Sequence, residues 1–366
     1  MRLLVQPDEG VRALVKGITN ATRRIEIVIF RFDQRGIELA LANAVTRGVS
    51  VHALVAHTNR AGEENLRRLE MRLLEAGVTV SRTAGDLERY HGKLMLVDGR
   101  ELYLLAFNWT YTDIEHSRSF GVVTRSPTLI REVERLFEAD AARLPYELCP
   151  DNLVVSPVNA RKLLTSFLKG AKQGLIIYDP KISDPAMIGL IEERSRAGVE
   201  IKILGRMTRR IPGLAVHKLA SLRLHTRTMV RDGTLAFVGS QSLRAVELDS
   251  RREVGVIFRD SRVVARLVQT FREDWSVVQQ TAQQTENDTP VGKVARRVAR
   301  LVTKDLPQVA PVLNGAVKEF VGSAIDVELN PDEVEAVVKG AVKKAVKEVV
   351  SDMVQEVVEE DQETAQ

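Results

Sequence analysis

The sequence contains an internal duplication, and this constrains the fold more than any other feature. The segment Leu3–Pro7 recurs as Leu153–Pro157, which lies 150 positions later, and Arg47–Val55 recurs at the same offset as Ala197–Gly205. A repeated segment that builds the same supersecondary unit twice is the economical explanation of such self-similarity. We therefore expect two homologous lobes.

Each copy alternates between strand-like and helix-like segments. An apolar, β-branched run at 25–30 or 174–179 comes first, and a segment of helical periodicity at 37–46 or 186–196 follows it. A further strand then begins after a glycine in both copies. This alternation predicts an α/β fold, in which each lobe has a mostly parallel or mixed sheet flanked by helices.

The composition of the C-terminal region sets the remaining boundaries. We predict lobe 1 at residues 1–148, lobe 2 at 149–280, a polar linker at 281–290 and a helical tail at 291–366. The tail contains a basic amphipathic segment, which suits either an anionic membrane surface or packing on protein. It also contains a stripe of valines, so both peripheral membrane contact and oligomerisation stay open.

The composition is that of a globular protein, with 44% hydrophobic and 28% charged residues among 366. No apolar run reaches the ~18 residues of a membrane span, and the N-terminus lacks a signal peptide pattern. The single cysteine, Cys149, excludes an intrachain disulfide and a Cys-rich metal site. We therefore predict a cytoplasmic protein that is at most peripheral to a membrane.

The net charge of +4 is the sum of two opposed regions. Residues 1–287 carry a net charge of +9, whereas residues 288–366 carry −5. A basic body suits a partner that bears phosphate, such as a lipid headgroup or a nucleic acid, although a surplus of this size also serves solubility.

Two matching motifs occur later in the repeat, at an offset of 134. His91 and Lys93 in the first copy correspond to His225 and Arg227 in the second. Residues two apart on a strand share a face, so each motif presents an imidazole beside a cation. A single His-x-Lys is usually a surface pair, but two copies at corresponding positions of a repeat favour a functional site.

Two such pairs in one cleft suit the cleavage of a phosphodiester. One imidazole can attack phosphorus while the other protonates the leaving oxygen, and the cations stabilise the developing charge. An unperturbed histidine pKa of ~6.5 makes both protonation states accessible near neutrality. This chemistry requires neither a metal ion nor another cofactor, and we predict none.

The pattern His-x-Lys, then Asp, then Gly-Ser-x-Asn resembles the phospholipase D superfamily over about residues 1–278. Two-lobed members of that superfamily include bacterial phospholipases D, cardiolipin synthases, phosphodiesterases and nucleases. The resemblance implies that His91 forms a phosphohistidine intermediate and that His225 acts as the general acid and then the base. It also implies that the carboxylate of Glu253 orients a histidine. In two-lobed members such a carboxylate can orient the histidine of the opposite lobe.

Both motifs depart from the family pattern, and the second is the more degenerate. Leu105 and Ala106 replace Gly and Ser in the first copy, while Arg227 replaces Lys and Ser242 replaces Asn in the second. The residues that we expect to bind substrate or orient the histidines are Asn108, Ser240, Ser242, Glu253, Asp98 and Asp232. Each of the two aspartates precedes a glycine, which favours a structural role in a turn.

Two features of the first copy stay open. Ser119 stands where the second copy has Glu253, and Asp113 or Glu115 are the candidates to replace the missing carboxylate. Three aromatic residues cluster beside Asn108, and they either line an apolar pocket or pack in the core. These are Phe107, Trp109 and Tyr111.

The sequence thus predicts a metal-independent phosphodiesterase or phosphatidyl transferase whose substrate is a phospholipid. A nuclease of the same fold is one alternative, which the absence of evident aromatic stacking platforms makes less favoured. A binding or scaffold protein that has kept the fold and lost activity is the other alternative, because the motifs are degenerate.

Overall fold

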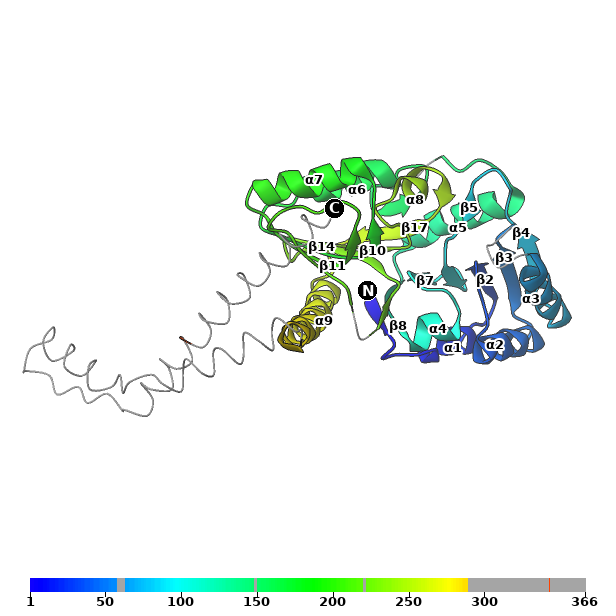
Figure 1. Cartoon of the computed structure of the whole chain (residues 1–366). Coiled ribbons are helices and arrows are strands. Elements are labelled where there is room, and N and C mark those ends of the chain that lie inside the picture. The colour runs from blue at the N-terminus through cyan, green and yellow to red at the C-terminus, as the bar shows by residue number, and fades with distance from the viewer. Residues whose placement is uncertain (58–62, 148–149, 220–221, 289–341, 343–366) are drawn as a thin grey trace, which may run out of the picture. The chain divides into compact units, whose positions relative to one another are not determined.

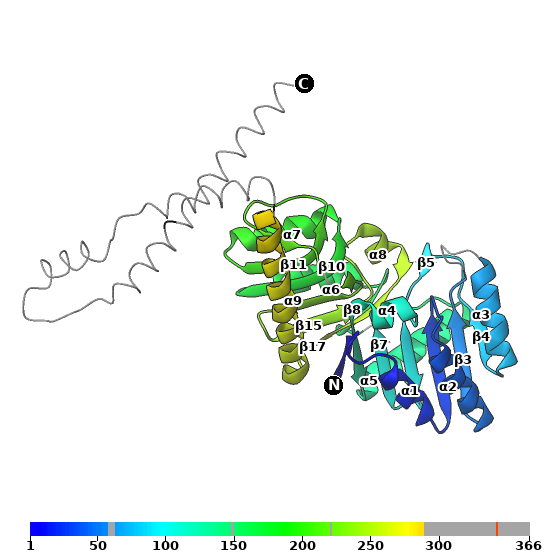
Figure 2. The same cartoon turned by 60° about the horizontal axis from the view of Figure 1, so that its bottom comes forward.

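The structure is a computed structural model that describes residues 1–57, 63–147, 150–219, 222–288 and Val342. It divides into two compact units, Met1–Val278 and Gln279–Gln366. Both sheets belong to the first unit (Figures 1 and 2). The predicted amphipathic tail at 291–366 lies outside the described residues except for Val342.

The first sheet has eight strands in the order β1-β8-β7-β6-β2-β3-β4, and β13 pairs with β8 beside this path. Neighbours from β1 to β2 are antiparallel, whereas β2, β3 and β4 are parallel. The strands are β1 (Arg2–Gln6), β2 (Arg24–Ile29), β3 (Ser50–Val55), β4 (Thr79–Arg82), β6 (Leu94–Val97), β7 (Glu101–Leu105), β8 (Ser117–Thr124) and β13 (Arg223–Leu224).

The second sheet has the order β12-β11-β10-β14-β15-β17-β9. Its strands are β9 (Leu153–Val155), β10 (Gly174–Ile182), β11 (Glu200–Met207), β12 (Ala215–His217), β14 (Arg227–Arg231), β15 (Leu235–Gly239) and β17 (Val254–Phe258). Read from β9, this sheet repeats the strand order and the strand directions of the first sheet. The prediction of two homologous α/β lobes with mixed sheets is confirmed.

Helices pack on both faces of the two sheets. The helices are α1 (Arg12–Thr19), α2 (Arg35–Thr46), α3 (Glu63–Glu75), α4 (Tyr111–Glu115), α5 (Pro127–Ala142), α6 (Ala160–Lys169), α7 (Pro185–Arg196), α8 (Ala245–Asp249) and α9 (Ser261–Asp288). Apolar residues of α1, α2 and α3 pack on the first sheet, and those of α6 and α7 pack on the second. Helix α9 continues through residues 281–288, where the sequence predicts a linker, because polar composition does not by itself end a helix.

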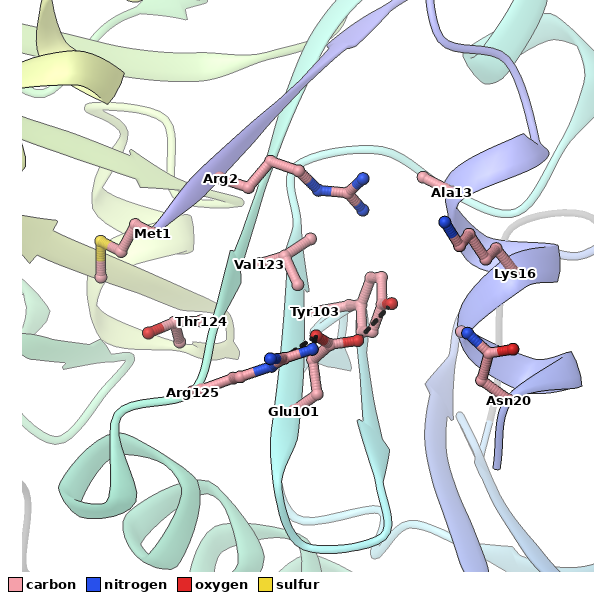
Figure 3. A pocket seen from close by; sticks show the side chains of 11 residues that line it. Met1, Arg2, Ala13, Lys16, Asn20, Glu101, Tyr103, Val123, Thr124 and Arg125 are labelled. Carbon is pink, nitrogen blue, oxygen red and sulfur yellow. Dashed lines mark hydrogen bonds and ion pairs between the residues drawn. The ribbon is translucent and has the colours of Figure 1, made fainter. Parts of the chain in front are cut away.

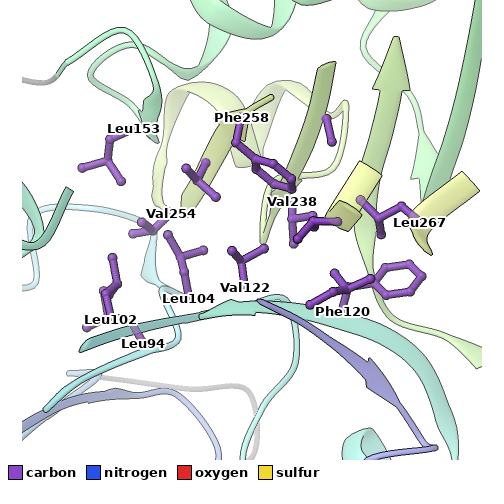
Figure 4. Close-up of a cluster of buried hydrophobic side chains, with 14 of the residues drawn as sticks. Leu94, Leu102, Leu104, Phe120, Val122, Leu153, Val238, Val254, Phe258 and Leu267 are labelled. Atoms are coloured by element: carbon purple, nitrogen blue, oxygen red, sulfur yellow. The ribbon is translucent and has the colours of Figure 1, made fainter. Parts of the chain in front are cut away.

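The inner faces of the two sheets share one hydrophobic core with α5 and α9 (Figure 4). Leu104 and Val122 from the first sheet lie in the same cluster as Val238 and Val254 from the second, and α9 adds Leu267. Fully burying one such aliphatic side chain stabilises a protein by about 1.5–3 kcal/mol. This core therefore holds the two repeats together as one body.

The Asp-Gly pairs that occur in both copies form equivalent hairpin turns. Asp98 and Gly99 both have positive φ, 55° and 62°, between β6 and β7, and Asp232 and Gly233 do the same between β14 and β15. The Asp98 carboxylate accepts hydrogen bonds from the backbone amides of residues 22, 23 and 24, at 2.8–3.2 Å. Each aspartate thus joins its turn to the start of a parallel strand.

We expect Asp98→Asn to destabilise the protein by about 2 kcal/mol at pH 7, because hydrogen bonds to a charged acceptor are lost. Burial raises the pKa of Asp98, but the backbone hydrogen bonds outweigh it and lower that pKa to about 2. A lowered carboxyl pKa contributes stability that is complete above the unfolded value of ~3.9 and is lost as the pH falls toward 2.

Urea unfolding of wild type and variant between pH 7 and pH 2.5 measures this effect. The difference in unfolding free energy should shrink as the pH falls, and Asp151→Asn, at an exposed position, serves as the control. A difference that stays constant with pH would contradict the assignment.

Candidate active site

Two short strands that precede the motif histidines cross between the repeats. β5 (Arg89–Tyr90) leads into His91 and pairs with β16 (Arg251–Arg252) of the second repeat. β13 leads into His225 and pairs with β8 of the first repeat. The backbone amide of His91 donates to the Arg252 carbonyl at 2.7 Å, and that of His225 donates to the Arg118 carbonyl at 3.1 Å. Each histidine is therefore fixed to the opposite copy.

The same two arginines make crossed ion pairs with the inner helices. Arg252 Nη2 lies 3.0 Å from the Asp140 carboxylate of α5, and Arg118 Nε lies 2.8 Å from that of Asp274 in α9. All four side chains are largely buried. Arg118 and Arg252 are 134 positions apart, and so are Asp140 and Asp274. The pseudo-symmetry of the repeat therefore includes these ion pairs as well as the histidines.

The first motif forms a buried cluster with a carboxylate of the second repeat. His91 Nδ1 lies 2.8 Å from Glu253 Oε2, and the edge of the Phe30 ring packs on the imidazole with 4.6 Å between ring centroids. Lys93, which is only 1% exposed, donates from Nζ to the carbonyl of His91 at 2.6 Å. The structure thus brings together three of the residues that the sequence predicts.

Burial dominates the electrostatics of this cluster. It lowers the pKa of His91 well below the usual value, and the charges of Lys93 and Arg227 lower that pKa further. Burial likewise raises the pKa of Glu253 and lowers that of Lys93 to about 7. A neutral His91 that donates its Nδ1 proton to Glu253 leaves its Nε2 lone pair available for attack.

The second motif places Arg227 as the first motif places Lys93. Arg227 Nη1 donates to the His225 carbonyl at 2.8 Å, and its Nε donates to Ser242 Oγ at 3.1 Å. The longer cation is therefore accommodated on the same backbone acceptor. Lys93 lowers the pKa of His225 and Arg227 lowers that of His91, so the two motifs lie within electrostatic range of each other.

The environment of His225 lacks a carboxylate at the position that corresponds to Glu253 beside His91. Ser119, the counterpart of Glu253, is fully buried, and its Oγ forms no hydrogen bond with any described residue. Asp113 instead places Oδ2 3.4 Å from His225 Nδ1. Burial lowers the pKa of His225 well below the usual value, and the Asp113 charge opposes this shift.

Asp113 has an equivalent in the second repeat that the sequence reasoning missed. Asp113 Oδ2 accepts from the backbone amide of Asn108 at 2.8 Å, and Glu247 Oε2 accepts from that of Ser242 at 2.8 Å. Arg223 also forms an ion pair with Asp113. Asp113 and Glu247 are 134 positions apart, so the register of the repeat was a signal that could have identified Glu247 once Asp113 was a candidate.

Two other predicted residues, Asp98 and Asp232, lie away from the histidines, and Ser240 lies nearer to them. Asp98 and Asp232 follow the far ends of β6 and β14, five residues or roughly 17 Å beyond Lys93 and Arg227. Ser240 is buried and accepts from the backbone amide of Val254 at 3.1 Å. Asp98 and Asp232 therefore serve the backbone in this structure, whereas the side chain of Ser240 also interacts with Glu253 and lowers its pKa.

The aromatic cluster beside Asn108 is mainly core. Phe107 and Trp109 are fully buried among the apolar side chains beneath the first sheet, whereas Tyr111 is 58% exposed. These three side chains do not form a common apolar pocket.

The described part of the chain contains no cluster of three or more His, Cys, Asp or Glu side chains that could hold a metal ion. Nor does it contain a helix with the length and apolar character that crossing a membrane requires.

Comparison with known proteins identifies relatives of both repeats. The family profile described as "Cardiolipin synthase, PLD-like domain" matches residues 14–141 and 164–275. The mitochondrial cardiolipin hydrolase of Danio rerio is 27% identical over 124 residues, which are 34% of this chain and 53% of that protein. The chain thus spans about half the length of this curated relative.

Two solved structures share the fold over most of the chain. Polyphosphate kinase from Porphyromonas gingivalis has a TM-score of 0.62 at 20% identity, covering 75% of this chain and 50% of that one. Phosphatidylserine synthase from Haemophilus influenzae Rd KW20 has a TM-score of 0.55 at 12% identity, covering 76% of this chain and 86% of that one. At these identities the likeness concerns the fold alone.

We expect both motif histidines to be neutral at pH 6, because burial lowers their pKa values well below 6.5. Long-range ¹H–¹⁵N spectra of histidine-labelled protein report the protonation and tautomer of each ring, and His91→Ala and His225→Ala provide the assignments. His91 should show the tautomer with the proton on Nδ1. Imidazolium signals from either residue at pH 6 would contradict this electrostatic account.

Proposed function

This chain belongs to the phospholipase D superfamily, and we propose that it is a metal-independent phosphodiesterase or phosphatidyl transferase that acts on phospholipids. The observation that carries the proposal is the reciprocal crossing of the repeats, which holds both His-x-cation motifs within electrostatic range. Such convergence of perturbed imidazoles and buried cations is typical of a catalytic site.

His91 is the proposed nucleophile. Its Nε2 attacks phosphorus, a P–N bond forms, and the bond from phosphorus to the leaving oxygen breaks. The proton for the leaving oxygen comes from His225, whose pKa the anionic substrate would raise. Lys93 and Arg227 stabilise the charge that develops on the phosphoryl oxygens.

The second half of the reaction reverses these roles. His225 accepts a proton from water or from an alcohol, whose oxygen attacks the phosphohistidine, and the P–N bond breaks to restore His91. Water gives hydrolysis, and an alcohol gives transfer of the phosphatidyl group. Glu253 keeps the His91 ring oriented through its contact with Nδ1.

Two considerations favour a phospholipid over a nucleic acid. The family description and the name of the zebrafish relative both refer to cardiolipin, which is a phospholipid. A net charge of +9 on residues 1–287 is also small for non-specific nucleic-acid binding. The scaffold alternative is weakened because Arg227 retains the backbone contact that Lys93 makes.

We expect His91→Ala to lower turnover of a chromogenic phosphodiester and of cardiolipin vesicles by at least ~10³-fold, because no nucleophile remains. EDTA should leave the wild-type rate unchanged. In His225→Ala, a phosphorylated His91 should accumulate and be detectable by mass spectrometry, because the second step lacks its base.

Three results would overturn this assignment. The wild-type protein could be inactive on every diester tested, it could lose its activity when EDTA is added, or it could cleave DNA or RNA in preference to lipid. A salt titration of nucleic-acid binding tests the last result, since phosphate contacts make binding strongly salt-dependent.

We further infer that Asp113 positions His225 in place of the missing carboxylate at Ser119. Asp113→Asn should lower kcat by about 10–100-fold and lower the pKa of His225, since the carboxylate charge raises that pKa. Arg223→Gln is the matched control, because it removes an ion-pair partner of Asp113 and keeps the carboxylate. It should raise the pKa of His225, which the Arg223 charge lowers, and so move it in the opposite direction.

Adding Ser119→Glu to Asp113→Asn tests the role by rescue. It restores a carboxylate at the position equivalent to Glu253, so kcat and the pKa of His225 should both recover in part. Thermal unfolding checks that each variant folds. An unchanged pKa of His225 in Asp113→Asn would show that Asp113 is merely structural.

A further inference from the structure

A cavity of about 410 Å³ lies at the end of the first sheet remote from the motif histidines. Its lining residues come from β1, α1, β7 and the end of β8, and the side chains are drawn in Figure 3. Glu101 and Tyr103, which line the cavity, lie in the first half of β7. Leu105, at the other end of β7, donates its backbone amide to the carbonyl of Lys93. The cavity is therefore separate from the proposed catalytic site.

Two cations face each other across this cavity. Figure 3 shows the guanidinium of Arg2, from β1, and the ammonium of Lys16, from α1, pointing toward one another. Within the described part of the chain, neither has a carboxylate within 4.0 Å. Both residues are exposed to solvent, and an anion between the two cations would be attracted by both.

The one carboxylate that lines the cavity is already engaged. Glu101 Oε2 accepts from the Tyr103 hydroxyl at 2.6 Å, and Oε1 accepts from Arg125 Nε at 3.0 Å. The charge of Arg125 is thereby balanced, and those of Arg2 and Lys16 are not. Asn20 adds an amide that can donate to a ligand (Figure 3).

A second cavity of about 350 Å³ adjoins the first and shares Gly17, Asn20, Glu101 and Arg125 with it. It adds Arg100, an exposed cation for which no ion pair is found among the described residues. Asp98, which also lines it, is committed to backbone amides. The two cavities thus form one groove with an excess of positive charge.

We propose that this groove is a second ligand site that binds a phosphate monoester, with Arg2 and Lys16 gripping the phosphate. Paired cations and an amide donor suit a dianionic group, since hydrogen bonds between charged partners are strong. The apolar side chains of Ala13 and Val123 can contact a small organic substituent. The phosphate can belong to a soluble metabolite or to a lipid headgroup.

Equilibrium dialysis of the full chain with glycerol 3-phosphate tests the soluble source. Sedimentation with vesicles of phosphatidylcholine, with or without one fifth phosphatidic acid, tests the headgroup. Arg2→Gln and Lys16→Gln should each weaken binding at one site about tenfold, and the double variant should lose one equivalent of bound ligand. Arg131→Gln, an exposed change of the same charge on α5, is the control.

Turnover of the chromogenic diester should be the same in all these variants, because neither cation belongs to the catalytic motifs. Loss of glycerol phosphate binding identifies a soluble ligand, and loss of binding only to phosphatidic acid vesicles identifies a headgroup. Equal binding by the double variant and Arg131→Gln in both assays would overturn the proposal. An inactive wild type would refute the proposed catalysis and leave this test intact.

Discussion

The site depends on the hydrogen bonds that tie each motif histidine to the opposite repeat. His91 donates its backbone amide to Arg252, and His225 donates its own to Arg118. Neither repeat alone contains both partners, so the site exists only when the two inner sheet faces have packed. The crossed pairs of Arg252 with Asp140 and Arg118 with Asp274 secure the same strands to α5 and α9. Formation of the inter-sheet core and formation of the site are thus one event.

The pseudo-symmetry of the repeats brings the two motifs together, and one departure from that symmetry, at the carboxylate beside each histidine, distinguishes them. His91 receives Glu253 at 2.8 Å, whereas the symmetric position opposite His225 is a serine and the nearest carboxylate is 3.4 Å away. A phosphohistidine mechanism needs one ring that is a neutral nucleophile and one that exchanges a proton. The closer carboxylate is placed to fix the tautomer of His91, while the Asp113 charge opposes the burial that lowers the pKa of His225. The difference between the two copies therefore suits the different roles that we propose, nucleophile for His91 and general acid and base for His225.

The sequence predicts those features that depend on local order along the chain. The offsets of 150 and 134 locate both lobes and both motifs, because strands and hairpin turns follow from local pattern. Asp113 was only one of two options, since its approach to His225 depends on how the repeats cross. Phe107 and Trp109 were ambiguous because packing between layers decides their burial. Helix α9 outlasts the predicted boundary at 281 because polar composition does not by itself end a helix.

Burial of the ionisable groups has an energetic consequence for the whole body. Lys93 and Glu253 are almost inaccessible to solvent, and desolvating such groups costs several kcal/mol unless partners offset it. The shifts in the pKa values of His91 and Lys93 express that cost. Under the proposed function, a phosphate in the site would bring negative charge among these cations and so offset part of that cost. The apolar core between the sheets stabilises the body in which these ionisable groups are buried.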